Sequence, residues 1–113
     1  MKARITAPAR RDMVVILAVS REQFGEGAQR RSRALLEQAI SDLEANPGRV
    51  GVVAFGESAE PIRLYHSRHS RGRVATRLRV ARPRHIIVFR VSELEILRVL
   101  HEAMDLPRRL RAG

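Results

Sequence analysis

The sequence contains no cysteine, so disulfides and thiolate chemistry are excluded and the fold must depend on packing alone. It also lacks any apolar run near the roughly 20 residues that a membrane-spanning helix requires. No basic stretch followed by an apolar one, as in a secretory signal, is present at the start. We therefore expect a mature cytoplasmic chain that does not contact a membrane.

The common signatures of nucleotide, metal and hydrolase sites are missing as well. The seven glycines form neither a GxGxxG nor a GxxxxGK[ST] pattern. His66, His69 and His85 lie in a segment without carboxylates or thiolates, and its arginines repel a cation, so these histidines are better suited to hydrogen bonds or to a phosphate contact. Ser67 and Ser70 lack the acid that a Ser/His/Asp hydrolase needs. We expect no metal ion and no cofactor.

Lysine occurs only once, as Lys2, against 21 arginines, a bias typical of GC-rich genomes. Composition does not explain where the charge lies. Residues 61–90 contain nine arginines and no Asp or Glu, whereas the other 83 residues hold 13 basic and 12 acidic groups. Nine of the ten net positive charges therefore lie in 30 residues. A field concentrated in this way attracts an extended anion, either nucleic acid or an acidic protein.

At 113 residues and 12.8 kDa the chain is long enough for one domain with one modest core, burying somewhat more than about 60% of its unfolded surface. Residues 2–5 are expected to form no more than a short opening strand. Thr6 can cap a helix over about residues 7–24, with Pro8 in the first turn, where its missing N–H costs nothing. Met13, Val14, Leu17, Arg21 and Phe24 follow a rough i, i+3, i+4 spacing, and the apolar residues of this helix are expected in the core.

A second helix is expected over about residues 28–45, and Asn46, Pro47 and Gly48 end it. Its apolar stripe consists of Leu35, Leu36, Ala39, Ile40 and Leu43. Two adjacent amphipathic helices joined by a short glycine linker predict an antiparallel hairpin that covers one face of a sheet.

The second half of the chain predicts strands. Residues 52–55 are apolar and fit either a strand or a loop on the core. Ile62 and Leu64 alternate with Arg63 and Tyr65, which predicts a half-exposed strand with the aliphatic residues inward. Residues 68–82 hold six arginines and only scattered apolar residues, and we expect a mobile basic excursion there.

Two apolar runs near the C-terminus, residues 86–91 and 94–100, are separated only by Ser92 and Glu93, which predicts a tight β-hairpin. Both faces of the first run are apolar, so its strand should be central. Phe89 is expected to point inward, toward the helices.

The run IIVFRV, then EILRVLH, then MDLPRRL, resembles the C-terminal half of ParE-type toxins of the RelE/ParE superfamily, the toxic halves of bacterial type II toxin–antitoxin pairs. The resemblance implies an α+β fold of the order β-α-α-β-β-β over a single domain, residues 1–113. It places a helical hairpin on a mostly antiparallel sheet with an N-terminal edge strand. Against the compact family pattern, residues 68–82 are a basic insertion.

ParE-type toxins are thought to act without catalysis, by poisoning DNA gyrase. The resemblance therefore implies a growth inhibitor that is not an enzyme, with DNA gyrase as its target. It also implies a cognate antitoxin, acidic and partly disordered when free, of the ParD kind. The target or the antitoxin is expected to bind the basic region, at Arg63, Tyr65, His66, Arg68, His69, Arg71, Arg73, Arg82, Arg84, His85 and Arg90.

Two alternatives remain open. RelE-type members of the superfamily are ribosome-dependent mRNA endonucleases, whose chemistry needs an acid/base group and cations for the developing phosphate charge. On that reading His101 would be the acid/base group and Arg63, Arg84 and Arg90 the cations, although the lysines of the RelE pattern are absent. Otherwise His101 is a structural residue at a strand end. The second alternative is a nucleic-acid-binding module without toxicity.

Overall fold

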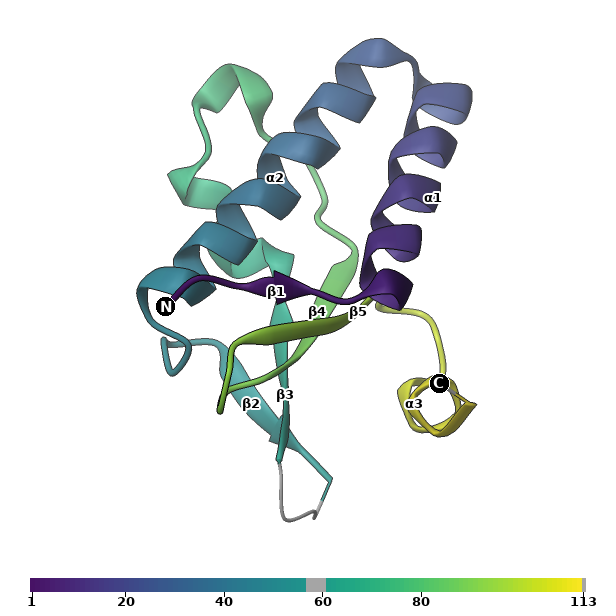
Figure 1. Ribbon diagram of the computed structural model, residues 1–113. Helices are drawn as coiled ribbons and strands as arrows, with labels where there is room; N and C mark the ends of the chain where they lie inside the picture. Colours follow the sequence, from purple (N-terminus) through teal and green to yellow (C-terminus); the bar gives the residue numbers. More distant parts are fainter. Residues whose placement is uncertain (57–60, 113) are drawn as a thin grey trace.

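The computed structural model describes residues 1–56 and 61–112 and places one helical layer against one sheet (Figure 1). The elements, in chain order, are β1 (Arg4–Ile5), α1 (Ala7–Phe24), α2 (Glu26–Ala45), β2 (Val52–Phe55), β3 (Ile62–His66), the 3₁₀ helices η1 (Ser67–Arg73) and η2 (Thr76–Leu78), β4 (His85–Arg90), β5 (Glu95–His101) and α3 (Leu106–Ala112). In these residues no helix is long and apolar enough to cross a membrane.

The sheet has the strand order β1-β5-β4-β3-β2, in which β1 runs parallel to β5 and every other pair is antiparallel. The α+β fold with an N-terminal edge strand is therefore confirmed. Residues 52–55, which the sequence left undecided, form a fifth strand at the other edge, paired with β3.

The helical hairpin turns at a single residue. Thr6 caps α1 by accepting a hydrogen bond from the Ala9 N–H at 3.4 Å, as predicted. Gly25 has φ 91°, a left-handed conformation that glycine adopts without strain, and its N–H bonds the Arg21 carbonyl at 2.9 Å. Because Gly25 makes the whole turn, α2 begins at Glu26, earlier than expected, and Gly27 lies inside the helix.

The side of α1 that faces the core differs from the prediction. Ala9 is fully buried, and Met13 and Ile16 pack against the same cluster. By contrast Val14 is 62% exposed and Phe24 74% exposed, so the expected inward positions of these two residues are wrong. Because the apolar residues of α1 are consecutive, more than one side of the helix could face the core. Polar contacts determine which side does.

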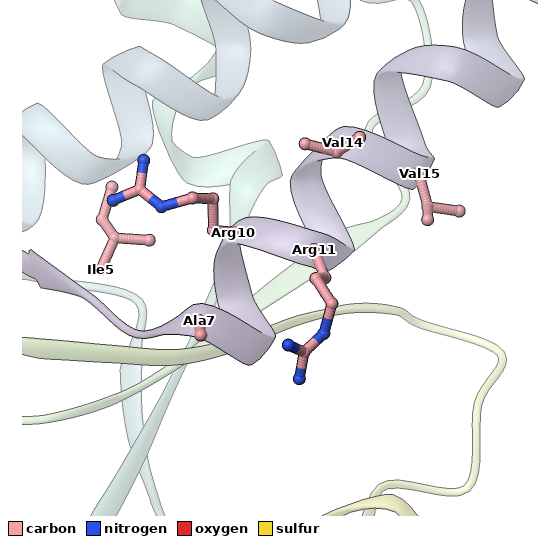
Figure 2. Close-up of a pocket in the computed structure, with 6 residues that line it drawn as sticks. All are labelled: Ile5, Ala7, Arg10, Arg11, Val14 and Val15. Carbon is pink, nitrogen blue, oxygen red and sulfur yellow. The ribbon is translucent and has the colours of Figure 1, made fainter.

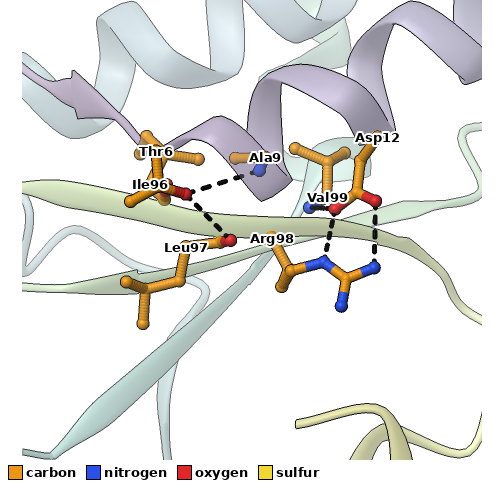
Figure 3. A network of polar contacts seen from close by, with 7 residues as sticks. All are labelled: Thr6, Ala9, Asp12, Ile96, Leu97, Arg98 and Val99. Atoms are coloured by element: carbon orange, nitrogen blue, oxygen red, sulfur yellow. Dashed lines mark hydrogen bonds and ion pairs between the residues drawn. The ribbon is translucent and has the colours of Figure 1, made fainter. Parts of the chain in front are cut away.

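The most extensive of these contacts joins α1 to β5 (Figure 3). The Arg98 guanidinium donates to both carboxylate oxygens of Asp12, at 2.7 and 3.0 Å, and the Val99 N–H donates to the same carboxylate at 2.9 Å. At the start of the helix the Thr6 hydroxyl donates to the Ile96 carbonyl at 2.9 Å. Together these bonds fix both the position of α1 along β5 and its rotation.

The core lies between α2 and the central strands. Ten buried residues form it: Ala9, Leu36, Ala39, Leu43, Tyr65, Ile87, Phe89, Leu94, Ile96 and Val99. Phe89 is fully buried, so its inward orientation is confirmed. The β4–β5 hairpin is also confirmed, with a turn over residues 91–94 and a shift of register between Val88 and Phe89.

The expected orientation of β3 is wrong. Tyr65, predicted to point outward, is fully buried in the core, while Ile62 and Leu64 are only half-buried. A buried tyrosine needs a partner for its hydroxyl. That partner is Ser70, in a polar cluster that the sequence pattern did not reveal.

Candidate target- and partner-binding surfaces

A buried carboxylate organises the basic half of the chain. Asp42, on α2, is 4% exposed and pairs with two arginines, Arg49 at 2.7 Å and Arg73 at 2.9 Å. It also accepts hydrogen bonds from the Ser70 hydroxyl at 2.6 Å and from the Gln38 amide at 2.9 Å. Because Ser70 and Arg73 belong to η1, Asp42 binds the start of the basic segment to α2.

The environment of Asp42 holds it ionised. Burial raises the pKa of its carboxyl, but the hydrogen bonds from Ser70 and Gln38 and the charges of Arg49 and Arg73 lower it further than burial raises it. The pKa of Asp42 therefore lies below its ordinary value, and at neutral pH the cluster contains a fixed negative charge.

Tyr65 completes the cluster from the sheet side. Its hydroxyl lies 2.7 Å from the Ser70 hydroxyl, and its ring centroid is 5.5 Å from the Arg49 guanidinium carbon. The centroid of the His69 ring is 5.6 Å from that of Tyr65, and the two rings are tilted relative to each other. Burial is the main cause that raises the pKa of Tyr65. Gly51 has φ 100° and lies against the His69 ring. A Cβ at position 51 would be 2.7 Å from the imidazole, so no larger residue fits there without displacing that ring. Tyr65 is thus a structural residue with no access to solvent.

The stretch expected to be a mobile excursion instead forms η1 and η2 on the flank of α2 away from α1 (Figure 1). We call residues 67–84 the arginine loop. Its own arginines brace it: Arg71 Nε donates to the Val80 carbonyl at 2.7 Å, and Arg79 donates to the Val74 and Gly72 carbonyls, each at 2.9 Å. These bonds connect η1 and the residue after it to the residues that follow η2.

The other arginines of the loop differ in what they contact. Arg73 pairs with Asp42, and Arg84 pairs with Glu102 at 3.0 Å. Arg68, Arg77 and Arg82 are exposed, and nothing in residues 1–56 or 61–109 hydrogen-bonds or pairs with their guanidinium groups. The sequence alone does not distinguish these arginines. In the structure Arg68, Arg77 and Arg82 are the loop arginines that are exposed and have no partner among the described residues.

Histidines lie where the loop leaves the sheet, at His66, and where it rejoins it, at His85. His66 is 9% exposed, and its Nδ1 accepts the Arg68 N–H at 3.0 Å, so the proton of the neutral ring is on Nε2, which donates to Glu102 at 2.7 Å. The hydrogen bonds from His66 and Arg84 lower the pKa of Glu102. This arrangement ties the end of β3 to the residue that follows β5.

His85 and His101 are cross-strand partners, with ring centroids 5.5 Å apart and planes at 87°. Burial, and then the charge of His101, lower the pKa of His85 to about 4, so it is neutral at physiological pH. His101 Nδ1 accepts the Ala103 N–H at 3.0 Å.

In residues 1–56 and 61–112 no group of three or more His, Asp or Glu side chains is arranged to hold a metal ion.

The four residues considered for ribonuclease chemistry do not come together. Arg63 pairs in register with Phe89, and Arg90 with Ile62, at the hairpin end of the sheet. His101 pairs with His85 at the opposite end of β4. His85 and Arg90 are five positions apart along the strand, which corresponds to about 16 Å at the usual rise. Arg84 precedes His85, so two candidates lie at each end of the sheet.

The outer face of α1 exposes apolar side chains. Val15 is 58% exposed and Val19 41%, near the exposed Val14, whereas Phe24, nine residues after Val15, lies on the opposite side of the helix. An open groove of about 560 Å³ crosses the start of this face, and Figure 2 shows valines and two arginine side chains along it. Its lining residues are Ile5, Ala7, Arg10, Arg11, Val14 and Val15.

Sequence reasoning missed both the Asp42 cluster and the outer face of α1. A signal existed for the first: Asp42 follows Ala39 by three residues, so it falls on the buried stripe of α2, where a carboxylate implies a buried partner. No such signal existed for α1, because its apolar run covers more than one face.

Comparison with known proteins agrees with this architecture. The family model described as ParE toxin of type II toxin-antitoxin system, parDE, matches residues 3–106, a span that includes both long helices and all five strands. No curated protein matches the chain. Since the matched span covers nearly the whole sequence, the chain belongs to the ParE toxin family of type II toxin–antitoxin systems.

Proposed function

We propose that the chain inhibits growth in the cytoplasm by poisoning DNA gyrase and that a cognate antitoxin neutralises it. Membership of the ParE family is the observation that carries the proposal. The family supplies the toxin role, and gyrase is the target that the family resemblance implies.

The placement of the ribonuclease candidates supports a mechanism without catalysis. An acid/base group and the cations that stabilise a phosphorane must converge within hydrogen-bond reach of one phosphate. Here Arg63 and Arg90 lie at one end of β4 and His101 at the other, about 16 Å away along the strand. Tyr65, the only tyrosine, is fully buried. The candidates therefore do not gather at one point of the sheet, as a phosphate site requires.

The antitoxin, on this proposal, covers the outer face of α1. Exposed Val14, Val15 and Val19 offer an apolar surface, and Arg10 and Arg11 lie in the groove at its start. An amphipathic helix that carries acidic residues beside its apolar ones matches both features. Such a segment, acidic and disordered when free, orders as it binds.

A paired assay tests the target. Purified wild-type protein should inhibit gyrase supercoiling or trap cleaved DNA, and His101→Ala should do the same, because no proton transfer is required. Codon-specific cleavage of ribosome-bound mRNA by the wild type, lost by about 10²- to 10⁴-fold in His101→Ala, would identify a nuclease instead and overturn the gyrase proposal.

A matched pair of valine substitutions tests the antitoxin surface. Val14→Glu places a carboxylate in the α1 groove, and Val50→Glu places one at a valine that is 91% exposed elsewhere. We expect Val14→Glu to weaken antitoxin binding at least about 10-fold, equal to about 1.4 kcal/mol, and Val50→Glu to leave it unchanged. Equal effects of the two variants would show that the antitoxin does not use this face.

A further inference from the structure

The exposed surface divides into two chemically different regions. The large hydrophobic side chains exposed in the described residues are Met1, Val14, Val15, Val19, Phe24, Val50, Val53 and Met104. None lies in the arginine loop, residues 67–84, where Val74 is buried and Leu78 and Val80 are half-buried. The loop therefore presents cations without the apolar surface that a protein segment packs against.

Five of the seven arginines in the loop have no carboxylate partner among the described residues. Arg71 and Arg79 donate only to neutral carbonyls, and Arg68, Arg77 and Arg82 meet no carboxylate within the described residues. The segment itself contains no Asp or Glu. Asp42 and Glu102 offset Arg73 and Arg84, and the other five arginines leave the loop with a net positive charge among the described residues.

The loop is also held in place before any ligand arrives. Asp42 binds Arg73 and Ser70 of η1 to α2, and the braces from Arg71 and Arg79 connect the two halves of the loop. A ligand therefore meets cations on an ordered backbone, and the entropy cost of fixing that backbone is already met by the fold.

We propose that the arginine loop binds the sugar–phosphate backbone of duplex DNA, through Arg68, Arg77 and Arg82. Guanidinium groups match phosphate geometry and contribute affinity without reading sequence. The loop contains no Phe, Tyr or Trp, and Tyr65 beside it is buried, so it lacks the stacking platform that single-strand binders use. Cations on an ordered backbone without Phe, Tyr or Trp suit the regular phosphates of a duplex.

This inference goes beyond the proposed function and does not depend on gyrase. In Figure 1 the arginine loop and α1 lie on opposite flanks of α2, so the proposed DNA surface is also distinct from the proposed antitoxin surface. A binding assay with DNA and the purified chain alone separates failure of this inference from failure of the gyrase proposal.

The test compares two triple variants of equal net charge. The loop triple is Arg68→Gln, Arg77→Gln and Arg82→Gln. The control triple is Arg30→Gln, Arg33→Gln and Arg108→Gln, three other exposed arginines for which no carboxylate partner is present in the described residues. Fluorescence anisotropy measures binding to a labelled DNA duplex of about 20 base pairs over a range of salt concentrations.

Each phosphate contact contributes about 0.9 to the slope of log K against log salt, so the loop triple should lower that slope by about 2 to 3. Its affinity should fall about 10- to 100-fold, while the control triple changes the slope by less than about 1. Replacing the same three loop residues by lysine retains the charge and should keep the slope near that of the wild type.

Four results would overturn the inference. Equal loss in both triples would mean that only net charge matters, and no loss in the loop triple would mean that DNA binds elsewhere. Tighter binding of a single strand than of a duplex would assign the loop to single-stranded nucleic acid. A polyglutamate peptide serves as the protein-like probe: if the loop triple lost only that peptide and kept DNA, the loop would be a surface for acidic protein.

Discussion

Replacing Asp42 by alanine should detach the arginine loop from α2 and destabilise the whole fold. The carboxylate is 4% exposed, and its loss leaves the Ser70 hydroxyl and the Arg49 guanidinium without their acceptor. Removing one partner of a buried ion pair costs about 3 to 5 kcal/mol. Arg73 is 61% exposed and can turn to water, so we expect the lower part of that range, about 3 kcal/mol.

Urea denaturation, with the slope of the transition held common to the variants, measures this loss. Glu37→Ala is the matched control: it removes a carboxylate from an exposed position of the same helix and should change the free energy of unfolding by less than about 0.5 kcal/mol. A loss below about 1 kcal/mol in Asp42→Ala would refute the view that the cluster anchors the loop. Amide exchange at η1 should accelerate in Asp42→Ala and remain unchanged in Glu37→Ala.

The pH dependence of stability gives a second measurement on the same residue. The pKa of Asp42 is lower in the fold than in the unfolded chain, so the unfolded chain takes up the proton first as the pH falls. The stabilisation is complete above the unfolded pKa of about 4 and is lost as the pH decreases through the lower folded value. Asp42→Asn should show a smaller decrease in stability below about pH 4 than the wild type.

Three further predictions follow from the core, the histidine pair and the α1–β5 contact. Phe89→Ala opens a cavity in the core and should cost about 3 to 5 kcal/mol of unfolding free energy, and a value below about 1 would contradict its buried position. Because the pKa of His85 is lowered to about 4, stability should fall from about pH 6.5 down to about pH 4, by at most about 1.4 kcal/mol per pH unit, and His85→Gln should flatten that slope in a pH-dependent melting series. Asp12→Ala leaves Arg98 and the Val99 N–H without an acceptor and should cost about 1 to 3 kcal/mol in urea denaturation, whereas an unchanged value would show that packing alone docks α1.

Local signals predicted the elements of the fold well. The threonine cap and the glycine turn define the start and end of α1, and the two apolar runs near the C-terminus define the β4–β5 hairpin. These signals depend on residues close together in the chain. They do not state which side of an element is buried when several of its faces are apolar.

The orientations that failed were decided by contacts distant in sequence. Tyr65 is buried because Ser70 and the Asp42 cluster provide a site for its hydroxyl, and α1 is rotated as it is because Asp12 reaches β5. Neither the helical nor the strand repeat of the sequence indicates which residues these bonds join. The basic loop was expected to be mobile for the same reason, since its anchor, Asp42, precedes it by 25 residues or more.

The division of the arginines changes how mutations in this chain should be interpreted. Arg73 pairs with Asp42 and Arg71 braces Val80, so a loss of toxicity on replacing either would report damage to the loop as much as loss of a target contact. Arg77 and Arg82 have no such intramolecular role within the described residues, so replacing them tests binding with the fold intact. A screen of the basic segment should therefore separate into variants that lower the melting temperature and variants that lower activity at an unchanged melting temperature. Only the second set defines the surface that a target contacts.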